Sequence, residues 1–409
     1  LRGVDLSHAN LTNCTLAGVN FAGTDLRYAI LKGARLDNLE GANVENTDFS
    51  GANLSMVCLS NCIFEACSKN LRFTRMDGVD LSSRTFRGFN MDRSSLAGAD
   101  LTGCDLSGCS LNNVNLEGAC LDKARLDDAS LFGANLIKAK LRASSCLRVQ
   151  LTEATLDGST FHEADLSFGG LNRASAVNCD FSKIVAKNSS WEDARLLNVC
   201  LDKANLQYSV FRRAKLNKAS LKESDLTGCV MMNTAMEAVI ANGANLTRSN
   251  FGDCDLKHSD LRGIIAVSSI MAGADLSSVN LQGAQILGVE WTVGLDRKVV
   301  LKGASMEGLN FHEANLSGVD MSHSRLYGAN LSRSKLDAAD LRFSDLHGCN
   351  LERAHLCGAF LEGARFDGCC VAGADFRESH IQGTLWQEPV PIRDPWALPD
   401  ATEQKGHPK

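Results

Sequence analysis

Residues 96–126 read LAGADLTGCDLSGCSLNNVNLEGACLDKARL, and every fifth residue of this stretch is Leu. The spacing continues in both directions. From Leu71 to Trp386 this position holds a large apolar residue, apart from Cys146, Ala176, Ala186, Ala241, Ala266 and Asp296. A helix repeats every ~3.6 residues and a strand every two, so a period of five suits neither. A fixed short period over hundreds of residues is typical of a solenoid.

The unit of five has a regular composition around its large central residue. In Ala99-Asp100-Leu101-Thr102-Gly103, a small residue stands two before the centre, and Asp or Asn stands between them. The two residues after the centre are mostly polar or Gly. We expect the large and the small side chain to point inward and interdigitate, while the other three face solvent. Asp, Asn and Gly would supply the turns at the corners.

This pattern resembles the A(D/N)LXX repeat of the pentapeptide-repeat family, over about residues 1–386. The resemblance implies an all-β fold, a right-handed quadrilateral β-helix with four pentapeptides, or twenty residues, in each coil. About nineteen coils at ~4.8 Å each would form a solenoid rod roughly 90 Å long. Central residues spaced by twenty support this coil length, because two sets of bulky side chains would stack in columns: Phe161 and Phe181, and Trp191, Phe211, Met231, Phe251, Met271, Trp291 and Phe311.

Composition limits the possible partners. Charged residues make up 22% of the chain, the net charge is −6 and the pI is near 5.9. A small negative net charge does not favour direct nucleic-acid binding. No apolar run approaches the length of a membrane span.

The sixteen cysteines do not indicate a metal site. Ten fall on inward positions and should act as small buried hydrophobic residues: Cys14, Cys62, Cys104, Cys109, Cys146, Cys179, Cys229, Cys254, Cys349 and Cys369. The others are expected at the surface or near corners: Cys58, Cys67, Cys120, Cys200, Cys357 and Cys370. No cysteine spacing matches a common zinc pattern. So many unpaired thiols favour the cytoplasm or another reducing compartment.

The register shifts twice near the N-terminus. Central residues run to Leu36 and continue at Val44, so residues 37–43 would contain three extra residues. Residues 65–70 would contain two more before the original frame resumes at Leu71. Arg84 and Phe89 then stand where small residues are expected. A local kink or bulge fits this region better than a binding loop.

Residues 292–300 interrupt the register again, because Asp296 falls on a central position. Burying an unpaired carboxylate is costly, so we expect a protruding loop with Asp296, Arg297 and Lys298 at its tip. Loops on rigid scaffolds often carry function, but a plain tolerated insertion is the favoured interpretation of this segment.

We expect residues 387–409 to form a separate Pro-rich cap or tail. All five prolines lie there, and proline cannot donate to a β ladder, so the β-helix domain should end at residue 386. Trp386, Ile392 and Trp396 could cover the open end; the alternative is an extended segment that recruits a partner. An uncapped end would allow an end-to-end homodimer. Leu1 already occupies a central position, which suggests a fragment or a processed product of a longer protein.

No catalytic, cofactor-binding or metal-binding motif is present in the sequence. A basic cluster is a solvated face or a contact for an acidic partner: Lys203, Arg212, Arg213, Lys215 and Lys218. Asp recurs just before the central residue, where it should satisfy the backbone of the turn. Some bacterial members of the resembled family use such carboxylates as DNA mimics that bind gyrase. Here the interspersed Lys and Arg argue against a surface of one sign.

The chain is therefore expected to be a non-enzymatic, rod-like scaffold for protein–protein interaction, with partners that the sequence does not name. One alternative is a DNA-mimicking inhibitor or protector of a topoisomerase such as gyrase. Another is the docking arm of a larger adapter or of a secreted effector.

Overall fold

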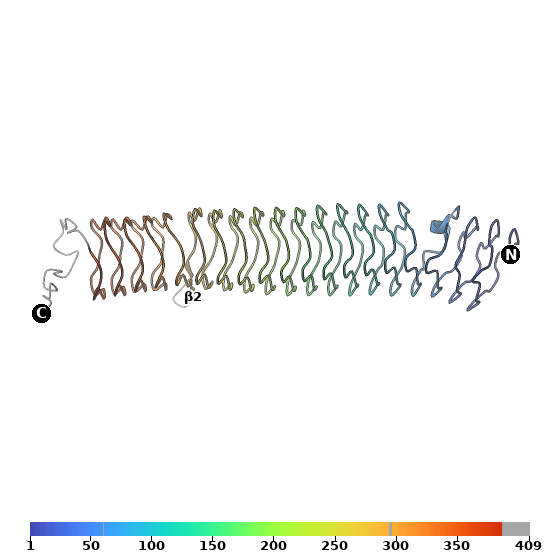
Figure 1. Ribbon diagram of the computed structural model, residues 1–409, viewed down its shortest axis with the longest axis horizontal. Helices are drawn as coiled ribbons and strands as arrows, with labels where there is room; N and C mark the ends of the chain where they lie inside the picture. The colour runs from blue at the N-terminus through green and yellow to red at the C-terminus, as the bar shows by residue number, and fades with distance from the viewer. Residues whose placement is uncertain (60, 294–296, 387–409) are drawn as a thin grey trace. The chain divides into compact units, whose positions relative to one another are not determined.

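Parallel bridges between residues twenty apart build the coils of this protein. The computed structural model describes residues 1–59, 61–293 and 297–386. The chain divides into two compact units, Leu1–Val210 and Phe211–Lys409. Asp100, Cys120 and Lys140 form successive bridges in the first unit, and Asn330 and Asn350 do so in the second. Within each unit, consecutive coils lie side by side (Figure 1).

A tight turn follows the central residue of every regular pentapeptide. The N–H of the next small residue donates to the carbonyl of the centre, as from Cys104 to Leu101 at 3.0 Å. Between Phe73 and Gly383, outside the 292–298 segment, the second residue after the centre always has a φ near +60°. This is the φ that the third residue of a type II turn requires and that favours Gly. Many of these residues are not Gly, and each then adds strain of about 1–2 kcal/mol.

The interior holds the large and the small residue of most pentapeptides, as predicted. Phe161 and Phe181 stack with ring centroids 5.1 Å apart in the first unit, and Trp291 and Phe311 lie 5.6 Å apart in the second. Small inward polar groups use carbonyls of the preceding coil: the Cys104 thiol donates to the Leu81 carbonyl. The predicted exposure of Cys67 is wrong, because its side chain is buried next to the 3-10 helix described below.

The first register break is a deletion, which corrects the predicted insertion of three residues in 37–43. Bridges here join residues eighteen apart, such as Asp25 and Asn43. Leu39 is itself a buried central residue, and its carbonyl accepts the turn bond from the N–H of Ala42. Removing two residues and adding three shift a five-residue register equally, so the sequence alone did not separate them.

The second break adds two residues, since Asn53 bridges Arg75. It contains the 3-10 helix η1, Phe64–Ala66. Phe64 is buried against Phe49, with ring centroids 5.2 Å apart. The original frame then returns, and Asn70 bridges Asn90.

A short hairpin interrupts the second unit. Strand β1, Thr292–Val293, pairs antiparallel with β2, Arg297–Lys298. Asp275 bridges Val300, twenty-five residues on, so this coil contains one additional pentapeptide (β2 is labelled in Figure 1). Arg297 and Lys298 were expected at a loop tip, but they lie in β2 instead. Asp296, the third residue expected there, and the whole predicted cap or tail at 387–409 lie outside the described residues. In the part of the chain that the structure describes, no helix has the length and apolar character of a membrane span.

Candidate functional site

The recurring Asp residues before the centres have a structural task. Each accepts a hydrogen bond from the backbone N–H two residues later, which is an Asx turn and confirms the prediction. The set comprises Asp5, Asp25, Asp100, Asp105, Asp165, Asp180, Asp225, Asp255, Asp260, Asp275, Asp320, Asp340, Asp345 and Asp375.

Several of these carboxylates are also neutralised locally by an arginine two residues later. The nitrogen–oxygen distance is 2.6 Å in each of the pairs Asp25–Arg27, Asp260–Arg262, Asp340–Arg342 and Asp375–Arg377. The hydrogen bond from the guanidinium is the main cause that lowers the pKa of each carboxyl. Ion pairs at these four positions interrupt the Asp series, so its members do not form an uninterrupted anionic row.

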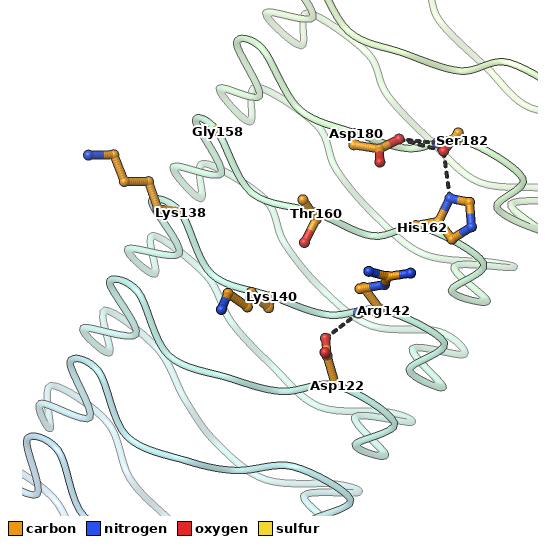
Figure 2. A pocket seen from close by; sticks show the side chains of 9 residues that line it. All are labelled: Asp122, Lys138, Lys140, Arg142, Gly158, Thr160, His162, Asp180 and Ser182. Carbon is orange, nitrogen blue, oxygen red and sulfur yellow. Dashed lines mark hydrogen bonds between the residues drawn. The ribbon is translucent and has the colours of Figure 1, made fainter.

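The first unit carries a hollow of about 680 Å³ on its surface. Its lining comes from four successive coils (Figure 2): Asp122, Lys138, Lys140, Arg142, Gly158, Thr160, His162, Asp180 and Ser182. The three long cationic side chains follow one another along the segment 138–142. The next coil places Gly158 and the half-buried Thr160 beside them. The alternation of long and short side chains between neighbouring coils produces the depression.

The carboxylates of the hollow are engaged with the backbone and with hydroxyls. Asp122 accepts from the N–H of Arg142 at 2.8 Å. Asp180 accepts from the N–H of Ser182 at 2.9 Å and from its hydroxyl at 2.5 Å. The Ser182 hydroxyl also lies 2.7 Å from Nδ1 of His162. This network holds the side of the hollow formed by His162, Asp180 and Ser182 in place (Figure 2).

The cations of the hollow are not engaged in the same way. Lys138, Lys140 and Arg142 are exposed, and none forms an ion pair with a residue that the structure describes. Elsewhere in the first unit, Arg148 contacts Asp128 at 2.6 Å. The three cations and two carboxylates that line the hollow therefore sum to about +1, with His162 not counted.

The residues singled out from the sequence lie elsewhere. Lys203 is exposed in the first unit, and the rest of the basic cluster is exposed in the second: Arg212, Arg213, Lys215 and Lys218. Lys298 is exposed in β2, which also contains Arg297. Asp296 and Trp396 lie outside the described residues. Sequence reasoning missed the segment 138–142, although aligning the chain in rows of twenty would have placed it beside Gly158 and Thr160.

A second surface feature is a set of bulky side chains at corners. Six large apolar residues occupy the positive-φ position and are at least half exposed: Tyr28, Met56, Phe73, Phe168, Tyr208 and Phe343. Neighbouring coils support some of them. Tyr28 stacks on His8 in the first unit, and Phe343 stacks on His323 in the second.

Cys62 and Cys67 follow Cys58 within ten residues, and both are buried. Burial raises the pKa of Cys62 to about 11 and raises that of Cys67 further, while Cys58 is exposed. Metal ligation requires the thiolate. Among the described residues, no group of three His, Cys, Asp or Glu side chains is placed to hold a metal ion.

A family model described as Pentapeptide repeats matches most of the chain: residues 1–38, 38–65, 74–113, 109–145, 194–233, 239–263, 254–289, 297–333, 334–371 and 344–383. No curated protein matches the sequence.

Solved structures of similar proteins include HetL from Nostoc sp. strain PCC 7120, involved in heterocyst differentiation regulation. It is 23% identical over 56% of this chain and 88% of its own, with a TM-score of 0.27. Rfr23 from Cyanothece 51142 is 31% identical over 25% of this chain and 68% of its own, with a TM-score of 0.24. The plasmid-mediated fluoroquinolone resistance protein QnrB1 is 13% identical over 57% of this chain and 90% of its own, with a TM-score of 0.27.

Proposed function

Because this chain belongs to the pentapeptide-repeat family, we propose that it is a non-enzymatic scaffold that binds protein partners through corner side chains. In this proposal residues 1–386 form one right-handed quadrilateral β-helix of about nineteen coils, from four pentapeptides per coil, and residues 387–409 form its cap or tail. The interior is filled by apolar side chains, so binding must use the outer faces and corners.

The observation that carries the proposal is the group of bulky corner residues. Phe168 is 56% exposed and has a φ of +60°, although Gly158 and Gly228 occupy equivalent corners. An L side chain at this φ costs about 1–2 kcal/mol, and an exposed ring recovers little of that through burial. The positive φ is shared by every regular corner, so the exposed apolar ring is what sets Phe168 apart. A rigid aromatic side chain is also a favourable anchor for a protein partner.

The arrangement of the carboxylates argues against the DNA-mimic alternative. Asp residues before the centres are bound to turn N–H groups, and arginines pair with several of them, as Arg342 does with Asp340. A duplex mimic needs a field dominated by one sign. The docking arm of a larger protein remains compatible with the scaffold proposal, because both use the same exposed corners.

The test compares partner capture by the wild-type chain and by Phe168→Gly/Tyr208→Gly, with quantitative mass spectrometry. Glycine suits the backbone at both corners, so the variant should fold and lose the proteins that depend on these rings. The matched control, Asn178→Gly/Asn188→Gly, alters two polar residues at equivalent corners of the same unit. Equal recovery of every enriched protein by the wild type and the aromatic variant would contradict the proposal, and so would turnover of a substrate by the purified chain.

A further inference from the structure

We propose that the hollow around Lys138, Lys140 and Arg142 is a docking site for an acidic segment of a protein partner. The inference rests on the proposed scaffold function and specifies a second contact, separate from the aromatic corners. Its ligand chemistry is a series of Asp or Glu carboxylates on an extended chain.

The shape of the hollow suits a peptide segment. Its volume of about 680 Å³ is far larger than the ~30 Å³ that one water occupies in the liquid, so it can take several side chains. Gly158 and Thr160 keep one row of the surface low beside the long side chains of the preceding coil. The hollow is bounded by regular coils whose backbone is hydrogen-bonded on either side, as Leu141 is to Thr160 at 2.7 Å. A partner therefore meets a preformed backbone surface.

The charges of the hollow favour carboxylate ligands. Lys138, Lys140 and Arg142 alternate along one segment and form no ion pair with any described residue. A bound carboxylate could accept charge-assisted hydrogen bonds from Arg142 in a bidentate arrangement, with the lysines acting as point charges. Asp122 and Asp180 flank these cations, and each has an oxygen that already accepts from a backbone N–H.

The same residues disfavour a nucleic acid. A nucleic-acid surface usually neutralises several phosphates along a continuous backbone, whereas this hollow has three unpaired cations and two flanking carboxylates. Single strands also bind by stacking bases on aromatic side chains. His162 is the sole ring in the lining, and its Nδ1 is engaged by the Ser182 hydroxyl. The acidic residues of a peptide can be spaced in its sequence so that they lie between Asp122 and Asp180. The phosphates of a nucleic acid have a fixed spacing and would meet these two carboxylates.

The test measures fluorescence anisotropy of labelled decaglutamate titrated with the full chain at low salt. Lys140→Glu/Arg142→Glu should weaken binding about tenfold, because attraction becomes repulsion at the centre of the hollow. Lys187→Glu/Arg195→Glu is the matched control: it makes the same charge change at equivalent pentapeptide positions outside the lining, and affinity should change less than about twofold. Lys140→Gln/Arg142→Gln should cause a smaller loss of affinity for decaglutamate. It replaces Lys140→Glu/Arg142→Glu in the test if thermal unfolding shows that the Glu variant does not fold.

Equal weakening by the hollow variant and the control would overturn the proposal, because net charge alone would then explain binding. Absence of decaglutamate binding by the wild type would also overturn it. Tighter binding of oligothymidylate than of decaglutamate would identify a nucleic-acid site instead. If the hollow fails while Phe168→Gly/Tyr208→Gly still loses its captured partner, the scaffold function stands and this second contact is wrong.

Discussion

Two phenylalanines of the first unit show how position within the pentapeptide separates stability from recognition. Phe181 is a central residue with no exposed surface, stacked on Phe161 and in edge contact with Trp191 at 5.3 Å. Phe168 is the second residue after a centre, 56% exposed and held at positive φ. Burial of its apolar surface makes Phe181 stabilising, whereas the exposed ring of Phe168 contributes little stability. The same residue type therefore stabilises the coil at one position and strains it at the other.

The largest expected difference comes from removing the two rings in turn. Phe181→Ala should lower the free energy of unfolding by about 3–5 kcal/mol, since it leaves a cavity between Phe161 and Trp191. Phe168→Ala should change it by less than about 1 kcal/mol, because no core contact is lost. Chemical denaturation of both variants measures the contrast. Similar losses from the two substitutions would break the comparison.

The side chain of Arg84 is intermediate in exposure between those of Phe181 and Phe168. Arg84 stands where a small inward residue is expected, yet its side chain is partly exposed and ion-paired with Glu65 at 3.0 Å. Its guanidinium also donates to the carbonyls of Leu59 and Cys62, beside the inserted 3-10 helix. Arg84→Ala should cost about 1–3 kcal/mol because the Cys62 carbonyl and the Glu65 carboxylate lose this donor. The Leu59 carbonyl keeps the turn bond from the N–H of Cys62.

The control for Arg84 is Arg87→Ala, which removes an exposed arginine 3.6 Å from Asp105. Surface pairs contribute less than about 1 kcal/mol, so its effect on thermal unfolding should be small. If Arg87→Ala costs as much as Arg84→Ala, the second register break is not stabilised by Arg84 in the way described.

Asp80 tests the contribution of the Asx turn on the outer face. Its pKa is lowered, mainly by the hydrogen bond from the backbone N–H of Ser82 at 2.9 Å. A lowered folded-state pKa means that this contribution is present above the unfolded pKa of about 3.9 and is lost as pH falls through the folded value. Asp80→Ala should cost about 1 kcal/mol at neutral pH and less in acid. Denaturation at pH values from neutral to below the folded pKa measures this change.

Asp80→Asn provides the control, because the amide oxygen accepts the same bond without titrating, as Asn90 does from Asp92. Its stability should therefore lack the acid-dependent component of the wild type. A pH dependence identical in the Asn variant and the wild type would assign that component to other carboxyls.

The sequence predicted most inward positions, apart from those at the register breaks, and little of the outer surface, for physical reasons. Burial forces large residues such as Phe181 into a strict period, so the coil can be predicted from spacing. Corner residues share a backbone conformation rather than a side-chain type, so the strain at Phe168 is invisible in composition. Deleting two residues before Leu39 shifts the five-residue register by the same amount as inserting three, so the sequence does not distinguish the two. The hollow depends on the relative lengths of Lys140 and Thr160, which are neighbours only after the chain has coiled.

The smallest expected change in the free energy of unfolding comes from relieving the backbone strain at Phe168. Phe168→Gly removes about 1–2 kcal/mol of left-handed strain, while the greater freedom of glycine in the unfolded chain costs about 0.5–1 kcal/mol. The net result should be a slight increase in the free energy of unfolding, measured by denaturation. Gly158→Ala makes the reverse change at an equivalent corner, where the new Cβ would meet Lys138 Cγ at an ordinary 3.6 Å, so any loss reports the backbone rather than a clash. A clear loss of stability in Phe168→Gly would mean that the ring packs against its own coils, and Phe168 would then belong with Phe181 rather than with the binding surface.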